Sequence, residues 1–581
     1  MLAKRVWSLL FLAIAAFYLY GLGAVPLVGP DEPRYAQVAR EMLARHDLIT
    51  PTLGGLPWFE KPPLLYWMMM ASYRVFGVSE FSARVGPMIC GLLTAVFIYW
   101  IAARGGSPTP GSPDGQPGWG EAVREGSVQV EQPSRNDLPG WSARVFLSCL
   151  GVIAFSRAAS FDIVLTMTLT GALACFFVWH VPYRTPTCRG SKRALAGADA
   201  GYPQARMPAL LFAFYFFIGL SLLAKGLIGI VIPFGVIAVY FLLRRQWPNR
   251  KFVVSLFWGV PLTLAVAAVW YGPMISRHGW TFVDQFIIQH HFARFATNKY
   301  HHPAPFYFYL PVLAGLALPW TVQLLASFIS ARRWNWRGDA PLDRLLVFAL
   351  AWIVVPVIFF SFSESKLTAY ILPVMPAVAL LIGERLTCFL RAGRGDRVMR
   401  FTSALLIALA VVAGWYSLRY LRLSWLCIGA TSLPLVVVGA TALLRPQMRK
   451  VLFVMIPLAM FAASAIAINC AAPVAARTES VRDLLAAANA RGYGAVPVVQ
   501  LHNIERTAEF YAAGRLDYGP DGEPIKLEGV TQVADTARRN RGVILCLVPT
   551  EYESQLTSYQ KIQAEVIANN GRVSLVIVRV P

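Results

Sequence analysis

Charged residues are scarce in this chain. They make up 14% of its 581 residues, whereas hydrophobic residues make up 56%. Soluble domains carry about a quarter charged residues, so this composition excludes an ordinary soluble protein. Several apolar runs reach or approach the roughly 20 residues that a helix needs to cross a bilayer. The chain is therefore expected to be a polytopic α-helical membrane protein.

Acidic residues are the scarcer of the two charged classes. The chain has 31 Asp and Glu against 53 Lys and Arg, which gives a net charge of +22. The basic residues lie in short clusters between apolar runs rather than on one soluble face, which argues against a nucleic-acid partner. The excess is instead typical of the positive-inside bias of a bacterial inner-membrane protein.

Cysteine is present only as eight scattered residues, and none of them forms a CxxC pair. Most lie inside apolar runs, where a free cysteine behaves as a small buried hydrophobic residue. The pattern therefore predicts neither a disulfide framework nor a thiolate metal site.

The apolar runs predict thirteen membrane spans. No A-x-A-like cleavage site follows the first run, which is therefore expected to be a span and not a cleavable signal. With a cytoplasmic N-terminus, the Lys and Arg clusters alternate consistently between the two sides. The predicted spans are residues 5–24, 83–103, 143–157, 163–182, 208–224, 227–244, 251–273, 307–330, 344–362, 367–390, 401–418, 424–444 and 451–471.

These spans divide the chain into two predicted domains. Residues 1–471 form the membrane domain, with long outer loops at 25–82 and 274–306. The Gly/Pro/Ser-rich cytoplasmic loop 104–142 cannot bury enough apolar surface to fold and is expected to be disordered and dispensable. From residue 472 to 581, helix-like segments alternate with three strand-like segments, at 495–499, 543–548 and 573–580, and predict a small α/β domain on the outer, periplasmic side.

Two charged motifs lie in the first outer loop. Residues 29–36 read Gly-Pro-Asp-Glu-Pro-Arg-Tyr-Ala and carry Asp31, Glu32 and Arg34, and Glu60-Lys61 precedes two prolines. The simple interpretation is a solvated loop tip with a helix cap. Because charges at the rim of a membrane bundle are costly and usually functional, two such motifs in one loop favour a catalytic pocket.

Other outer turns also carry charge, although the positive-inside rule makes outer turns charge-poor. Asp162 lies between spans three and four, where the simple alternative is a helix N-cap. Lys225 lies in an otherwise apolar run, so it needs a partner or a ligand phosphate. Lys366 and Tyr370 lie in the turn between spans nine and ten.

Three of these motifs together resemble a known family. They are Asp-Glu-Pro-Arg-Tyr-Ala at 31–36, Glu-Lys-Pro-Pro-Leu-x-Tyr-Trp at 60–67 and Ser-Lys-Leu-x-x-Tyr-Ile-Leu-Pro at 365–373. The chain is similar to the bacterial undecaprenyl-phosphate-aminoarabinose:lipid A transferases. These are GT-C glycosyltransferases related to protein O-mannosyltransferases. The resemblance implies an undecaprenyl-phosphate-linked 4-amino-4-deoxy-L-arabinose donor, a lipid A phosphate acceptor and a role in polymyxin resistance. It also implies a multi-pass inner-membrane enzyme whose active site faces the periplasm and contacts membrane lipid.

Candidate roles follow from the chemistry of such a transfer. Cations would hold the donor phosphate, which is the leaving group. An acceptor phosphate is already an anion, so Asp31 would position Lys61 or stabilise positive charge at the anomeric carbon, with a general-base role as the competing interpretation. The candidate catalytic residues are Asp31, Glu32 and Asp162. The candidate substrate-binding residues are Arg34, Glu60, Lys61, Lys225, Arg294, Lys366 and Tyr370.

Five of the eight histidines lie in loop 274–306, including the pair His290-His291. The HH dipeptides lack the i, i+4 spacing of a helical zinc pair. They favour hydrogen bonding to lipid headgroups and loop backbone. The weaker alternative is a divalent metal at Glu60, His290 and His291, and the sequence establishes no cofactor.

Two rival functions are open at this point. A transporter would place its charges at mid-span and often shows inverted repeats, whereas here the charges lie at outer turns and no repeat is evident. A GT-C enzyme that uses another polyprenyl-phosphate sugar, such as mannose or galacturonate, or a protein acceptor, fits the same motifs.

Overall fold

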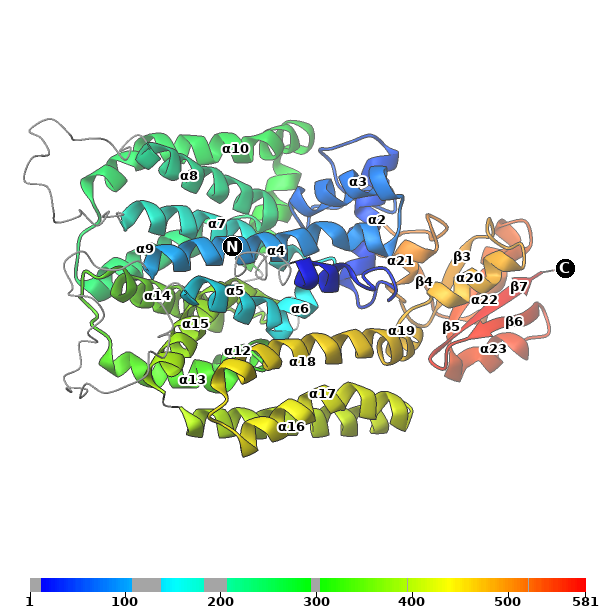
Figure 1. Cartoon of the computed structure of the whole chain (residues 1–581). Coiled ribbons are helices and arrows are strands. Elements are labelled where there is room, and N and C mark those ends of the chain that lie inside the picture. The colour runs from blue at the N-terminus through cyan, green and yellow to red at the C-terminus, as the bar shows by residue number, and fades with distance from the viewer. Residues whose placement is uncertain are drawn as a thin grey trace, which may run out of the picture.

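A computed structural model describes residues 12–106, 137–181, 206–293, 304–393, 395–520 and 522–580. A long bundle of helices makes up most of the molecule, and a small mixed sheet domain adjoins one end of it (Figure 1). We call this end, which carries the segment from Asp31 to Phe76, the outer end, and the opposite end of the bundle the inner end. The predicted cytoplasmic loop 104–142 lies mostly in residues 107–136, outside the described residues.

The first outer region folds into short elements at the outer end. Residues 12–19 are helical and lead into α2 (Asp31–Ala44), the hairpin β1 (Thr52–Leu53) and β2 (Leu56–Pro57), and α3 (Leu64–Phe76). Asp31 and Glu32 occupy the first turn of α2, where negative charge is favoured by the helix dipole. The hairpin turns at Gly54 and Gly55, which both have positive φ, as a tight turn of this kind requires.

The bundle consists of helices from α4 to α18. Ser79 caps α4 with a reciprocal capping box. The bounds of the helices are α4 Glu80–Gly105, α5 Leu138–Ser148, α6 Leu150–Ser156, α7 Phe161–His180, α8 Arg206–Lys225, α9 Ile228–Arg244, α10 Arg250–Phe282, η2 Val283–Ala293, η3 Phe306–Phe308, α12 Tyr309–Leu316, α13 Thr321–Ser330, η4 Ala331–Arg333, α14 Pro341–Ser361, η5 Thr368–Val374, α15 Met375–Ala392, α16 Asp396–Arg419, α17 Trp425–Leu444 and α18 Arg449–Cys470.

Twelve of the predicted spans coincide with helical structure, and in the first predicted span residues 12–19 are helical while residues 5–11 lie outside the described residues. Within the described ranges, nine helices are long and apolar enough to cross a membrane, and two bent pairs raise the number to eleven. The pairs are α5 with α6, bent by 65°, and Phe306–Leu316 with Thr321–Arg333, bent by 117°. The two remaining predicted spans are α9, with 17 residues, and the helix at 12–19. The predicted polytopic α-helical fold class is confirmed.

The helices differ in how far the protein itself buries them. The most apolar windows of α7 and of Thr368–Ala392 are each 89% buried, whereas those of α16, α17 and α18 are 22%, 28% and 39% buried. Apolar surface that the protein leaves uncovered is what a membrane-spanning helix presents to lipid tails. The helices α16–α18 therefore form a lipid-facing layer beside the core.

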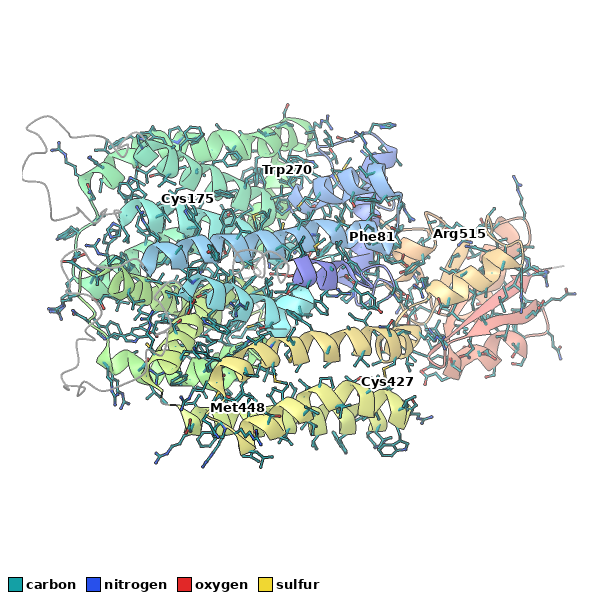
Figure 2. All side chains as sticks on the ribbon, in the orientation of Figure 1. Phe81, Cys175, Trp270, Cys427, Met448 and Arg515 are labelled. Carbon is teal, nitrogen blue, oxygen red and sulfur yellow. A yellow bond between two sulfur atoms is a disulfide. The ribbon has the colours of Figure 1, made fainter. Side chains whose placement is uncertain are left out.

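Two cysteines correct the interpretation of all eight as small buried hydrophobic residues. Cys427 and Cys470 form a disulfide that ties the start of α17 to the end of α18. Figure 2 shows Cys427 at the end of this layer nearer the sheet domain and Met448 toward the other end. Disulfides persist in oxidising compartments, so a disulfide at the outer end agrees with the predicted orientation.

The C-terminal region is a mixed α/β unit. Its five-stranded sheet has the order β4-β3-β5-β7-β6, parallel from β4 to β5 and antiparallel from β5 to β6. Three strands were expected from the apolar pattern, and two further strands, β4 and β6, complete the sheet. Its elements are α19 Ala472–Glu479, α20 Arg482–Ala490, β3 Val498–Leu501, α21 Ala508–Tyr511, β4 Lys526–Leu527, α22 Val530–Arg539, β5 Val543–Pro549, η6 Thr550–Tyr552, α23 Glu553–Thr557, β6 Gln563–Asn569 and β7 Val573–Arg579.

The C-terminal unit is docked on the outer end through α21. Tyr511 accepts a hydrogen bond from the backbone N–H of Leu27 at 2.8 Å and donates one to Glu80 at 2.9 Å. Arg40 of α2 donates to the carbonyl of Phe510 at 2.8 Å, and its guanidinium lies 4.8 Å from the ring of Phe510. These contacts place the C-terminal unit against the helix that carries the first charged motif.

Candidate functional site

Glu60 is the centre of a charged cluster at the outer end. Its carboxylate accepts from Lys61 Nζ at 3.0 Å and lies 3.7 Å from the Arg34 guanidinium. Burial alone would raise the pKa of the Glu60 carboxyl, but the positive charges of Lys61, His290 and Arg34 hold it at about 2. Glu60 is therefore an anion that several cations share.

Three of the predicted carboxylates converge on Tyr35, which is buried in α2. Burial raises the pKa of the Tyr35 hydroxyl, and the negative charges of Asp31, Glu60 and Asp162 raise it further. The three carboxylates that act on Tyr35 come from α2, from the loop before α3 and from the start of α7. Asp31 is exposed, so its carboxylate remains accessible to a ligand.

Asp162 pairs with Lys225, which comes from the outer end of α8. Lys225 Nζ contacts the Asp162 carboxylate and also lies 4.7 Å from the centre of the Tyr370 ring. The N-cap of α7 is Ser160, whose hydroxyl accepts from the Asp162 N–H at 3.1 Å. Ser160 takes the capping role, so the Asp162 side chain is left to hold the lysine.

Glu32 has a different environment from its neighbour Asp31. Its two carboxylate oxygens accept from Arg84 Nε at 3.0 Å and Nη2 at 2.8 Å. They also accept from the backbone N–H groups of Ala159 at 2.7 Å and Val28 at 3.2 Å. This carboxylate joins α2, α4 and the turn before α7, and these bonds favour a structural role for Glu32 over the predicted catalytic one.

Arg34 lies between two carboxylates, and the second was not anticipated from the sequence. Arg34 Nε lies 3.8 Å from Glu509 Oε1, and its Nη1 faces Glu60. The Glu509 side chain is 0% exposed and belongs to α21 of the C-terminal unit. No local motif marks Glu509, because its significance comes only from the docking of one unit on the other.

Aromatic rings enclose the charged cluster. The rings of Tyr35 and Tyr66 pack edge-to-face on Phe161 at centroid distances of 4.8 and 5.3 Å. The guanidinium of Arg34 lies 5.9 Å from the ring of Trp58. None of these aromatic residues was predicted from the sequence as a site residue. The signal that could have identified them is their position, because Tyr35, Trp58 and Tyr66 lie in or beside the charged motifs.

The remaining candidates are less informative. Lys366 Nζ donates to the carbonyl of Ser363, within its own turn, at 2.6 Å. Arg294 and the side chain of His291 lie outside the described residues. Among the side chains that the structure describes, no three His, Cys, Asp or Glu residues are grouped as metal ligands. The predicted metal site at Glu60, His290 and His291 stays a prediction.

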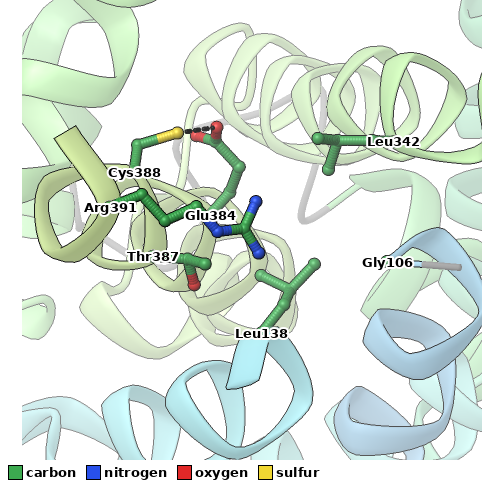
Figure 3. Close-up of a pocket in the computed structure, with 7 residues that line it drawn as sticks. All are labelled: Gly106, Leu138, Leu342, Glu384, Thr387, Cys388 and Arg391. Atoms are coloured by element: carbon green, nitrogen blue, oxygen red, sulfur yellow. Dashed lines mark hydrogen bonds between the residues drawn. The ribbon is translucent and has the colours of Figure 1, made fainter. Parts of the chain in front are cut away.

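A separate, small pocket lies at the inner end (Figure 3). Cys388 Sγ donates to Glu384 Oε1 at 2.8 Å on its wall, and Gly106 at the end of α4 also lines it. The 26 residues of α4 span about 39 Å, so this pocket is far from the charged cluster at the start of that helix. It does not contribute to the candidate site.

Comparison with known proteins identifies similar sequences. Residues 60–110 match the family model of the dolichyl-phosphate-mannose-protein mannosyltransferases. The chain is 31% identical over 70% of its length to the undecaprenyl phosphate-alpha-4-amino-4-deoxy-L-arabinose arabinosyl transferase of Erwinia tasmaniensis and 31% identical over 71% to that of Aeromonas salmonicida. The matched regions cover 64% and 66% of these relatives, so the chain spans slightly less than two thirds of their length.

Solved structures show the same fold over nearly the whole chain. ArnT from Cupriavidus metallidurans bound to undecaprenyl phosphate superimposes with a TM-score of 0.74 at 21% identity, covering 98% of both chains. The apo state of that protein gives a TM-score of 0.73 at 22% identity, covering 99% of this chain and 98% of the other. The predicted GT-C fold and the resemblance to the aminoarabinose transferases are confirmed.

Proposed function

We propose that this chain, which shares the sequence motifs and the fold of the aminoarabinose transferases, is a membrane glycosyltransferase. It would move a sugar, 4-amino-4-deoxy-L-arabinose, from an undecaprenyl-phosphate donor to a phosphate of lipid A. The names of the relatives supply the donor, and the acceptor follows from the family resemblance.

One observation carries the proposal. The outer end holds two largely buried cation–carboxylate pairs, Glu60–Lys61 and Asp162–Lys225, and the exposed carboxylate of Asp31 acts electrostatically on the same Tyr35 as Glu60 and Asp162 do. Burying both members of an ion pair usually costs more than it gains. An anionic lipid phosphate that binds the ammonium groups supplies a functional reason to maintain this arrangement.

The reaction needs no proton abstraction at the acceptor. The acceptor phosphate oxygen forms a bond to the anomeric carbon while the bond from that carbon to the donor phosphate oxygen breaks. The Lys61 ammonium stabilises the negative charge that grows on the departing phosphate. Asp31 stabilises the positive charge that develops on the sugar at the same moment.

The proposed location follows from the orientation of the chain. The site lies at the outer end, with the C-terminal unit and the Cys427–Cys470 disulfide. In a bacterial inner membrane this end would face the periplasm, where disulfides form and where lipid A in the outer leaflet is accessible. We assign residues 1–471 to the membrane catalytic domain and 472–581 to the periplasmic domain.

The test is the mass of lipid A from cells with and without the gene. Addition of aminoarabinose predicts a mass increase in the expressing cells, and purified protein should transfer the sugar from the undecaprenyl-phosphate donor. The mass increase should be absent when Lys61→Ala replaces the natural protein. Unchanged lipid A in cells that contain the folded protein would contradict the proposal.

A different donor or acceptor is the main alternative. Residues 60–110, which begin with the Glu60–Lys61 pair, match the family model of the dolichyl-phosphate-mannose-protein mannosyltransferases, so the same region fits an enzyme that transfers another sugar. Transfer of mannose or galacturonate would change the proposed donor, and sugar found on protein rather than on lipid A would change the proposed acceptor. Either result would leave the proposed mechanism unchanged.

A further inference from the structure

A line of alternating charges connects the C-terminal unit to Lys61. Arg506 Nη1 lies 3.1 Å from Glu509 Oε1, and Glu509 lies 3.8 Å from Arg34 Nε. Arg34 lies 3.7 Å from Glu60, which pairs with Lys61 at 3.0 Å. The first two residues belong to the C-terminal unit and the last three to the first outer region, so the line crosses the docking surface between them.

Glu509 is the buried member of this line. Its side chain is 0% exposed, and among the described residues its Oε2 has no hydrogen-bond partner. Burial raises the pKa of the Glu509 carboxyl, and the guanidinium groups of Arg34 and Arg506 oppose that rise. A carboxylate that is this completely buried is costly to maintain, and an apolar side chain would serve packing alone better.

The proposed function supplies a reason for the cost. Lys61 pairs with Glu60 when no donor is present, so binding a donor phosphate requires the ammonium to turn from Glu60 toward the ligand. The largely buried Glu60 carboxylate would then lose the ammonium and depend on the positive charges of His290 and Arg34. Arg34 can contribute to this compensation only if its guanidinium stays in place when the lysine moves.

We propose that Glu509 is a positioning residue of the donor site, which holds Arg34 against Glu60 so that Lys61 is free to bind the donor phosphate. This inference rests on the proposed function. It makes the C-terminal unit a part of the catalytic machinery, because a residue of that unit sets the charge balance around Lys61.

The test compares Glu509→Gln with Tyr511→Phe. The first change removes the charge and keeps the shape, whereas the second removes two hydrogen bonds of the same helix and leaves the line of charges intact. We expect Glu509→Gln to weaken undecaprenyl phosphate binding and to raise the KM for the donor, each by about tenfold, with an unchanged or higher melting temperature. Tyr511→Phe should lower the melting temperature and keep the KM.

A double-mutant cycle shows whether Glu509 acts through Lys61. In a Lys61→Met background, Glu509→Gln should cause little further loss of undecaprenyl phosphate binding, because the group that it positions is already absent. If the two substitutions instead reduce undecaprenyl phosphate binding independently, so that their factors multiply in the double variant, the inference is overturned. If Glu509→Gln does not fold, Glu509→Met, which also removes the charge, serves instead, and wild-type phosphate binding by that folded variant would overturn the inference.

The two proposals fail differently. A wild-type protein that neither binds undecaprenyl phosphate nor transfers sugar from it contradicts the proposed function. A wild-type protein that does both, beside a folded Glu509→Gln variant with the same affinity and KM, contradicts only the positioning role of Glu509.

Discussion

The two ends of the helix bundle use ion pairs in different ways. At the outer end several pairs have both partners largely buried, as in Arg84–Glu32 with side chains 5% and 10% exposed and Lys225–Asp162 with 17% and 15%. At the inner end the carboxylate is exposed: the Arg244 side chain is 0% exposed, but its partner Asp339 is 76% exposed.

The difference in burial distinguishes charged residues that set the orientation of the chain in the membrane from charged residues that form a site. An exposed carboxylate stays hydrated, so an inner-end pair costs little and contributes little. Basic residues at that end are sufficiently explained by the positive-inside rule. A pair with both members buried carries a large desolvation cost. The occurrence of such pairs at several outer turns therefore indicates either an ion pair that holds structural elements together or a ligand site.

The strongest test of the outer end is Lys61→Ala. Because the fixed ammonium stabilises the departing phosphate more in the transition state than in the ground state, transfer should fall on the order of 10²–10³-fold. Lys61→Arg should rescue only in part, since a planar guanidinium does not reproduce a compact ammonium. The measurement is turnover per folded molecule in detergent, beside a melting curve.

The matched control is Arg74→Ala, which removes an exposed cation from the end of α3 in the same region. It should leave turnover and melting near the natural values. Near-normal turnover in folded Lys61→Ala would remove Lys61 from the mechanism and reduce its pair with Glu60 to a structural contact.

Neighbouring carboxylates provide the second test. Glu32→Gln should lower the free energy of unfolding by about 3 kcal/mol, because it leaves the buried Arg84 guanidinium without its counter-ion. Asp31→Asn should leave the melting temperature unchanged and reduce transfer, since Asp31 is exposed at the site. Thermal melting and turnover of both variants distinguish a carboxylate that holds helices together from one that takes part in the reaction. The assignment is wrong if Glu32→Gln melts normally and is inactive.

The disulfide at the outer end provides a third test. Replacing both Cys427 and Cys470 by Ser should lower stability by about 2 kcal/mol, since the bond closes a loop between two positions that are 43 residues apart in the sequence. Turnover of the folded fraction should stay normal, because the pair lies in the lipid-facing layer. Melting curves with and without reductant give the measurement, and a natural protein insensitive to reductant would contradict the orientation.

The inner end should show the smallest effect. Asp339→Asn removes an exposed partner of Arg244 and Arg344 and should change stability by at most about 1 kcal/mol. Transfer should be unaffected. A strong loss of turnover in this variant would mean that the inner end takes part in the reaction, and the contrast between the two ends would fail.

Local patterns were sufficient for much of the architecture. Apolar length located every span, because a helix in lipid must satisfy its own backbone and remain apolar over the bilayer thickness. The strands β3, β5 and β7 were visible as apolar runs. The bends within the pairs α5–α6 and Phe306–Arg333 were not, since each pair reads as one continuous apolar segment.

Long-range pairing was the part that local patterns could not supply. The Cys427–Cys470 bond and the contact of Glu509 with Arg34 join residues that no motif connects. Both depend on which elements pack together. Glu32 is the opposite case: its motif predicted a catalytic residue, whereas its contacts favour a structural role.

The amino-acid sequence by itself determined that this protein spans a membrane, that its charged motifs lie at outer turns and that they resemble those of a lipid-linked sugar transferase. These properties depend on composition and on short stretches of chain. Only the tertiary structure decided which charges meet. The cost of burying a charge depends on the partner beside it, and the partners of Arg34, Asp162 and Glu32 come from distant segments that folding brings together.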